Sequence, residues 1–109
     1  MPTVQDWLWI EVMFIQALLG SISSNVRRVV ISFNQEEWVL VATLERMNEE
    51  DKEEMEDAVD EFSILLEDIK EHITEIAYTK AKAKIIVSKD KPTPINNENM
   101  RIVFQRKEV

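Results

Sequence analysis

The first apolar stretch of the chain predicts a helix that is apolar on nearly all sides. Thr3 and Asp6 have the spacing of a capping box, which satisfies free backbone N–H groups where a helix begins. Gly20 stands where a helix ends in a left-handed residue, so we expect a helix over about Val4 to Leu19. Apolar side chains occupy most of its circumference: Trp7, Leu8, Ile10, Val12, Phe14, Ile15, Leu18 and Leu19. Such a helix packs on a sheet and needs a second cover, which a loop, a second copy or a partner would supply.

Two alternating stretches follow and predict a β-hairpin. In 26–33 the residues Val29, Ile31 and Phe33 share one face, with Arg28, Val30 and Ser32 on the other. In 38–45 the alternation places four residues inward: Trp38, Leu40, Ala42 and Leu44. Because four polar positions join the two stretches, they are expected to pair as antiparallel neighbours.

A strongly acidic second helix is predicted after the hairpin. Asn48 is the expected N-cap, with acidic residues in the positive first turn. Apolar residues at three–four spacing form the inward stripe: Met55, Val59, Phe62, Leu66 and Ile69. At about 100° per residue, the opposite face holds Glu53, Asp57, Asp60, Ile64 and Asp68, with Glu56 and Glu67 beside them. A solvated face would explain the acids, but the apolar Ile64 in their midst is less usual.

The last third of the chain predicts two more strands. The stretch 76–87 alternates, with Ala77, Thr79, Ala81, Ala83, Ile85 and Val87 on one face and Lys80, Lys82 and Lys84 on the other. Alternating lysines are typical of an edge or solvent-facing strand. A polar loop with two prolines follows, and 100–106 forms the last strand, with Ile102 and Phe104 inward.

These elements predict one α+β domain over residues 1–109, in the order αββαββ. Moving the last strand to the front gives the order of the split βαβ, so we expect a circularly permuted ferredoxin-like fold. Four antiparallel strands would then carry both helices on one face. The other face, with Arg28, Val30, Val39, Val41 and the lysines, would be bare or covered by a second copy.

Composition makes an enzyme the less expected class. The chain of 109 residues has no cysteine, one histidine (His72) and one glycine, which excludes thiolate sites, His-rich metal sites and Gly-rich phosphate loops. No inward-facing carboxyl group is expected that could act as a general acid. Trp7, Trp9 and Trp38 are explained by the core, and His72 by an exposed position near a helix end. We therefore expect no catalytic residue, no cofactor and no metal.

The charge is concentrated in the middle of the chain. The net charge is −8, and residues 45–75 alone hold 14 acidic and 3 basic residues. This disfavours nucleic acid and anionic membranes as direct partners. No basic residue precedes the apolar run 7–19, which is too short and polar to span a bilayer, so a soluble cytoplasmic protein is expected.

A family resemblance narrows the function. Four parts of the chain carry the resemblance: Leu18-Leu19-Gly20-Ser21-Ile22-Ser23-Ser24-Asn25-Val26-Arg27, the hairpin with Trp38, the acidic stretch 48–57 with Asp60-Glu61-Phe62, and the ending Val103-Phe104-Gln105-Arg106-Lys107-Glu108. In pattern and order the chain resembles small cytoplasmic immunity proteins encoded beside bacterial polymorphic toxins, including those of contact-dependent growth inhibition. The resemblance implies that the protein binds one cognate toxin domain, often a nuclease, and blocks its active site. It transfers no contact residue to this chain.

Two hypotheses follow. In the first, the protein is an antitoxin and nuclease inhibitor that binds a basic toxin groove one to one, through Glu53, Asp57, Asp60, Ile64, Glu67 and Asp68. Carboxylates would steer association, and Ile64 would be the apolar anchor. In the alternative, a homodimeric ligand-binding or regulatory module uses the open sheet face, with Val30, Val39 and Val41 at the interface. The lysines of 80–84 or the Trp9–Met13 side of the first helix would also serve a different partner.

Overall fold

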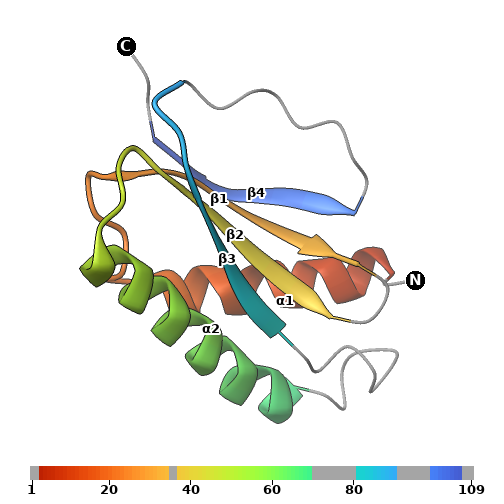
Figure 1. The fold of residues 1–109 in the computed structure, drawn as a ribbon. Helices are drawn as coiled ribbons and strands as arrows, with labels where there is room; N and C mark the ends of the chain where they lie inside the picture. The colour runs from red at the N-terminus through yellow and green to blue at the C-terminus, as the bar shows by residue number, and fades with distance from the viewer. Residues whose placement is uncertain (1–2, 35–36, 70–80, 91–98, 107–109) are drawn as a thin grey trace.

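The fold is an α+β arrangement of two helices and a four-stranded sheet (Figure 1). The computed structural model describes residues 3–34, 37–69, 81–90 and 99–106, without the side chains of residues 66, 68 and 69. The elements are α1 (Val4–Leu18), β1 (Val26–Phe33), β2 (Trp38–Leu44), α2 (Glu49–Ile69), β3 (Ala81–Val87) and β4 (Met100–Gln105). The predicted fold class and the order αββαββ are confirmed.

Local sequence signals set the helix ends where they were predicted. Thr3 and Asp6 form the capping box, with both backbone-to-side-chain hydrogen bonds at 3.0 Å. Helix α1 ends at Leu18, and Gly20 has a φ of 83°, a conformation that glycine adopts without a steric cost. Asn48 caps α2, because its Oδ1 accepts a hydrogen bond from the Asp51 N–H at 3.1 Å. Each cap depends on residues within three positions, so the sequence alone predicts it.

The sheet is mixed rather than wholly antiparallel. Its strand order is β3-β2-β1-β4. Strand β1 pairs antiparallel with β2, as the predicted hairpin requires, and also with β4, whereas β2 pairs parallel with β3. The cause is the crossover through α2, which brings the chain back so that β3 starts beside the start of β2. In a split βαβ another strand separates these two. Here they are neighbours, so the expected permuted ferredoxin-like strand order is not formed.

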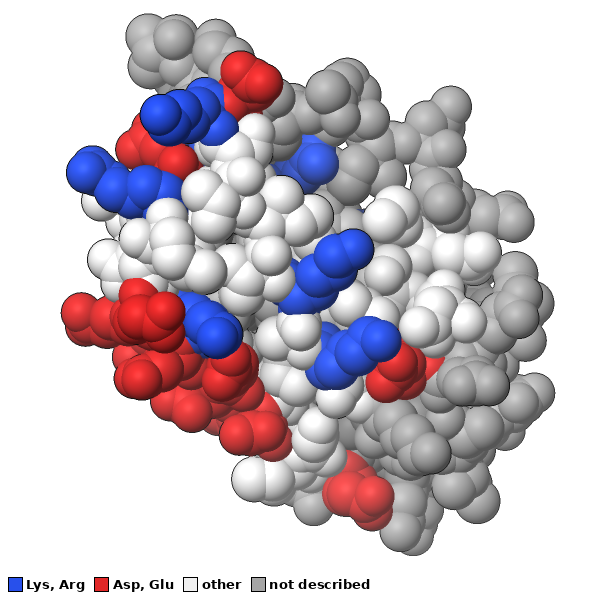
Figure 2. All heavy atoms as spheres, viewed as in Figure 1, with Lys and Arg blue, Asp and Glu red and all other residues white. Residues whose placement is uncertain are grey.

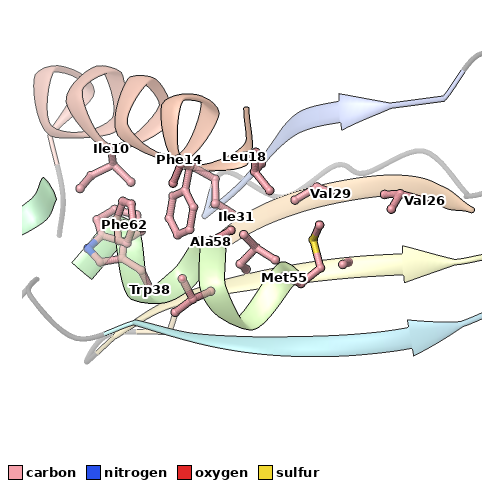
Figure 3. Close-up of a cluster of buried hydrophobic side chains, with 14 of the residues drawn as sticks. Ile10, Phe14, Leu18, Val26, Val29, Ile31, Trp38, Met55, Ala58 and Phe62 are labelled. Carbon is pink, nitrogen blue, oxygen red and sulfur yellow. The ribbon is translucent and has the colours of Figure 1, made fainter. Parts of the chain in front are cut away.

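The core lies between one face of the sheet and both helices. Ile10, Phe14 and Leu18 point from α1 toward the sheet, and Met55, Ala58 and Phe62 contribute from α2 (Figure 3). The rings of Phe14 and Phe62 stack with centroids 3.6 Å apart, which joins the helices. The inward residues predicted for the hairpin are all buried here: Val29, Ile31, Phe33, Trp38, Leu40, Ala42 and Leu44. With its apolar stripe held in this core, α2 must turn its acidic side outward.

The edge strands depart from the simple alternation. A shift in the β1–β4 register between Val29 and Val30 places Ile102 opposite Val30, where it is 44% exposed, so its predicted inward position is wrong. A bulge of this kind changes the face to which later side chains point. Phe104 packs against the core as predicted. On β3, Ala81, Ala83 and Ile85 pack inward, but Val87 at the strand end is exposed. The predicted positions 76–80, including Lys80, lie outside the described residues.

Candidate partner-binding surface

Helix α2 presents an outward face of carboxylates around one apolar side chain. Glu53, Asp57, Asp60 and Glu67 are exposed, and Ile64 is 66% exposed. We call these five residues the acidic face. Figure 2 shows acidic side chains gathered over this helix. Of the six residues predicted for a binding site, the structure therefore brings five together on one helix face. The sixth, Asp68, lies in α2, but its side chain is not described.

Helix α2 is itself strongly acidic. Helix α2 contains eleven acidic residues and a single lysine. The ion pairs seen in the described ranges join Lys82 to Glu37, Arg101 to Glu11 and Arg106 to Glu45, and none of them involves Glu53, Asp57 or Asp60. Exposed carboxylates of this kind accept hydrogen bonds from water or from the lysines and arginines of a partner.

A shallow groove runs between the acidic face and the edge of the sheet. It has a volume of about 320 Å³ and is lined by Glu56, Val59 and Asp60 of α2 and by Ala81, Lys82 and Ala83 of β3. Lys82 and Lys84 are exposed on β3, which is an edge strand as their alternation predicted. Basic side chains lie beside the acidic ones in Figure 2. The Nζ atom of Lys82 is 2.8 Å from a carboxylate oxygen of Glu37, so a nearby acid offsets its charge.

The start of α2 is anchored by a polar contact that the sequence did not reveal. Asp51 is 5% exposed, and its carboxylate accepts hydrogen bonds from the Ser23 hydroxyl and the Asn25 side-chain amide, both at 2.8 Å. The Asn25 side chain also donates to the carbonyl of Arg46 and accepts from its N–H. These residues line a polar hollow of about 410 Å³. No spacing pattern points to such a contact, because Ser23 and Asp51 are 28 positions apart.

Other kinds of site find little support among the described residues. In those ranges no group of three His, Asp or Glu side chains is placed to hold a metal ion. His72 lies outside them. Neither described helix is long and apolar enough to cross a membrane. What this part of the chain offers is a surface for charged and apolar contacts with another molecule.

Comparison with known families decides the class of protein. The sequence matches the model of the MafI2 immunity protein family over residues 5–108. The chain belongs to this family. The predicted small bacterial immunity protein of a polymorphic toxin system is thereby confirmed. Among proteins with curated descriptions, none matches this sequence. Family membership assigns toxin immunity to this MafI2 family protein and implies a cognate toxin as its partner.

The three valines predicted for the alternative interface expose little apolar surface. Val30 is only 3% exposed and Val39 only 7%, while Val41 is half-buried. An interface gains stability by removing apolar surface from water. Because these valines are already covered within one chain of this MafI2 family protein, a second copy would bury little more of their apolar surface.

Proposed function

We propose that the protein protects its own cell by covering the basic substrate groove of a nuclease toxin domain with the acidic face of α2, one to one, in the cytoplasm. The observation that supports this best is the charge of α2, which holds eleven acidic residues and a single lysine and exposes Glu53, Asp57 and Asp60. A groove that binds nucleic acid carries lysines and arginines for the phosphates. Carboxylates on a rigid helix complement such a groove and exclude the substrate from it.

The charge would act first on the rate of association. Opposite charges on two proteins steer their encounter and raise the association rate by roughly ten- to a thousandfold at low salt. Fast capture suits an inhibitor that must reach a toxin before the toxin acts. The same mechanism predicts that the association rate falls as salt is added, since exposed charges are screened over about 10 Å at 0.1 M ionic strength.

Ile64 would contribute most to holding the complex together. Interface hot spots lie at the centre of a ring of contacts that excludes water, and an apolar side chain among polar neighbours fits this arrangement. With 66% of its surface exposed, burying Ile64 would contribute about 1 to 2 kcal/mol. Its carboxylate neighbours then form charge-assisted hydrogen bonds at the rim.

The test is a pair of variants with the same change in net charge at different places. Asp57→Asn combined with Asp60→Asn removes two charges from the acidic face, and Asp90→Lys makes the same total change at an exposed position outside α2. Toxin captured from the producing cells with the tagged protein supplies the partner. We expect the double variant to associate about tenfold more slowly, and Asp90→Lys to behave like the parent.

Charge reversal gives the stronger test in cells. Asp57→Lys combined with Asp60→Lys should abolish protection while circular dichroism shows an unchanged fold, because both side chains are exposed. The captured toxin, once separated from the tagged protein, is assayed for cleavage of RNA and DNA. When the protein is titrated back, cleavage should stop once the molar amounts of protein and toxin are equal. Full protection by the charge-reversed variant would show that the binding site lies elsewhere. A toxin that cleaves no nucleic acid would refute the nuclease assignment.

A further inference from the structure

Helix α1 carries an apolar stripe on the side that faces away from the core. Four large apolar residues of α1 and its C-cap Leu19 are exposed on this side: Val4 at 77%, Leu8 at 51%, Val12 at 54%, Ile15 at 48% and Leu19 at 75%. Their spacing of four, four, three and four residues places them in one line along the helix. We call these five residues the outer stripe. Since Ile10, Phe14 and Leu18 already hold α1 on the sheet, the outer stripe is not needed for the core.

The surface around the outer stripe has two shallow apolar hollows, one toward each end of α1. The first, of about 220 Å³, is lined by Gln5, Leu8, Trp9 and Val12. The second, of about 300 Å³, is lined by Ile15, Leu18, Leu19, Gly20, Ile22, Val103 and Phe104. Side chains of a facing helix could seat in such hollows, as knobs do in holes.

Charge distinguishes the outer stripe from the rest of this acidic chain. Its neighbours on one flank are the uncharged Gln5 and Gln16. The acid on the other flank, Glu11, is 3.7 Å from the guanidinium of Arg101, which offsets its charge. Two copies that met through the acidic face of α2 would bring the exposed carboxylates of both helices together. Two copies that meet through the outer stripe avoid this repulsion.

We propose that the protein forms a twofold-symmetric dimer in which the α1 helices pair antiparallel along the outer stripe. Position i then faces position 23 − i, so Val4 faces the second copy's Leu19, Leu8 faces its Ile15, and Val12 lies at the axis. The pattern complements itself, as a twofold interface requires. Antiparallel pairing also opposes the two helix dipoles favourably. This inference does not rest on the acidic face, which stays uncovered.

The size of the stripe predicts a dimer that dissociates on dilution. Helix α1 has 15 residues and is therefore about 22 Å long. With five side chains about half exposed or more on each copy, the pairing would cover about 1,000 Å² in total, near the lower limit for a specific interface. The monomer–dimer equilibrium should therefore be visible by sedimentation velocity over a range of protein concentrations.

The absence of cysteine from the chain allows a direct test of the geometry. Val12→Cys places a single thiol beside the proposed axis, where facing helices come close enough for a disulfide. Mild oxidation should convert this variant to a covalent dimer. Ile64→Cys is the matched control, because Ile64 is more exposed than Val12 but lies on α2. This variant should stay largely monomeric. Equal rates of cross-linking in the two variants would overturn the proposal.

A second pair of variants tests the same surface without oxidation. Leu8→Glu combined with Ile15→Glu should give the monomer mass of 12.8 kDa, whereas Ile64→Glu should retain the dimer. Both substituted α1 positions are about half exposed, and circular dichroism checks the fold. A monomeric parent at every concentration, or a dimer that survives the double substitution, refutes the pairing. A monomeric parent whose double variant no longer captures the toxin would assign the outer stripe to the toxin instead.

Discussion

The hydrogen bonds of Asp51 should make it the most important acid for the stability of α2. Asp51→Ala removes a carboxylate that is 5% exposed and accepts two hydrogen bonds at 2.8 Å. The Ser23 hydroxyl and the Asn25 amide would each lose an ionised acceptor. Hydrogen bonds to charged groups contribute roughly 1.5 to 3 kcal/mol each. The hollow beside them admits water, which would replace part of this.

We therefore expect Asp51→Ala to lower the free energy of unfolding by about 2 to 3 kcal/mol. For a domain of this size, the melting temperature should fall by roughly 10 to 15 °C. Glu50→Ala is the matched control. It removes the same charge from the same first turn of α2, but Glu50 is exposed. The control should change stability by less than about 0.5 kcal/mol.

The assay is urea unfolding followed by tryptophan fluorescence, because Trp38 is completely buried and reports on the core. A double-mutant cycle with Ser23→Ala isolates one of the two hydrogen bonds, and we expect a coupling energy of about 1 kcal/mol. If Asp51→Ala and Glu50→Ala unfold at the same urea concentration with equal slopes, the contact stabilises nothing and the argument fails.

Two further predictions concern the core and the end of α1. Phe62→Ala removes a fully buried ring stacked on Phe14, so it should lower the free energy of unfolding by about 3 to 5 kcal/mol. Ile64→Ala, on the exposed side of the same helix, should change the free energy measured by urea unfolding by less than about 0.5 kcal/mol. Similar losses for both variants would contradict the observed burial. Gly20→Ala should cost about 1 kcal/mol, since φ is 83° although no atom lies within 4 Å of an added Cβ. Gly20→Asn should cost less, because asparagine tolerates this conformation, and a thermal melt in which both variants equal the parent would show that the strain argument is wrong.

The candidate site could be predicted from the sequence to the extent that it lies on one helix. The acidic face follows from the helical repeat, because one stripe of apolar residues fixes which side of α2 is buried. The anchor of that helix could not be predicted. Asp51 looked like one more acid in a favourable first turn, and only the approach of the connector after α1 buries it beside Ser23 and Asn25.

The outer stripe shows the same division between local and tertiary information. The sequence predicts that α1 is apolar nearly all round and needs a second cover. It does not show which of these apolar residues pack against the sheet. The structure assigns Ile10, Phe14 and Leu18 to the core and leaves the line from Val4 to Leu19 in solvent. Each element that packs against a helix covers one of its faces, so the number of packed elements decides which apolar side chains remain exposed.

The sequence by itself determined the elements, their caps and the inward face of the hairpin, because these depend on residues a few positions apart. Only the tertiary structure decided that β3 runs parallel to β2, that a bulge turns Ile102 outward, and that Val30 and Val39 are covered. Strand pairing and burial join residues far apart in the chain. Their energies depend on how the layers pack, which periodicity does not encode.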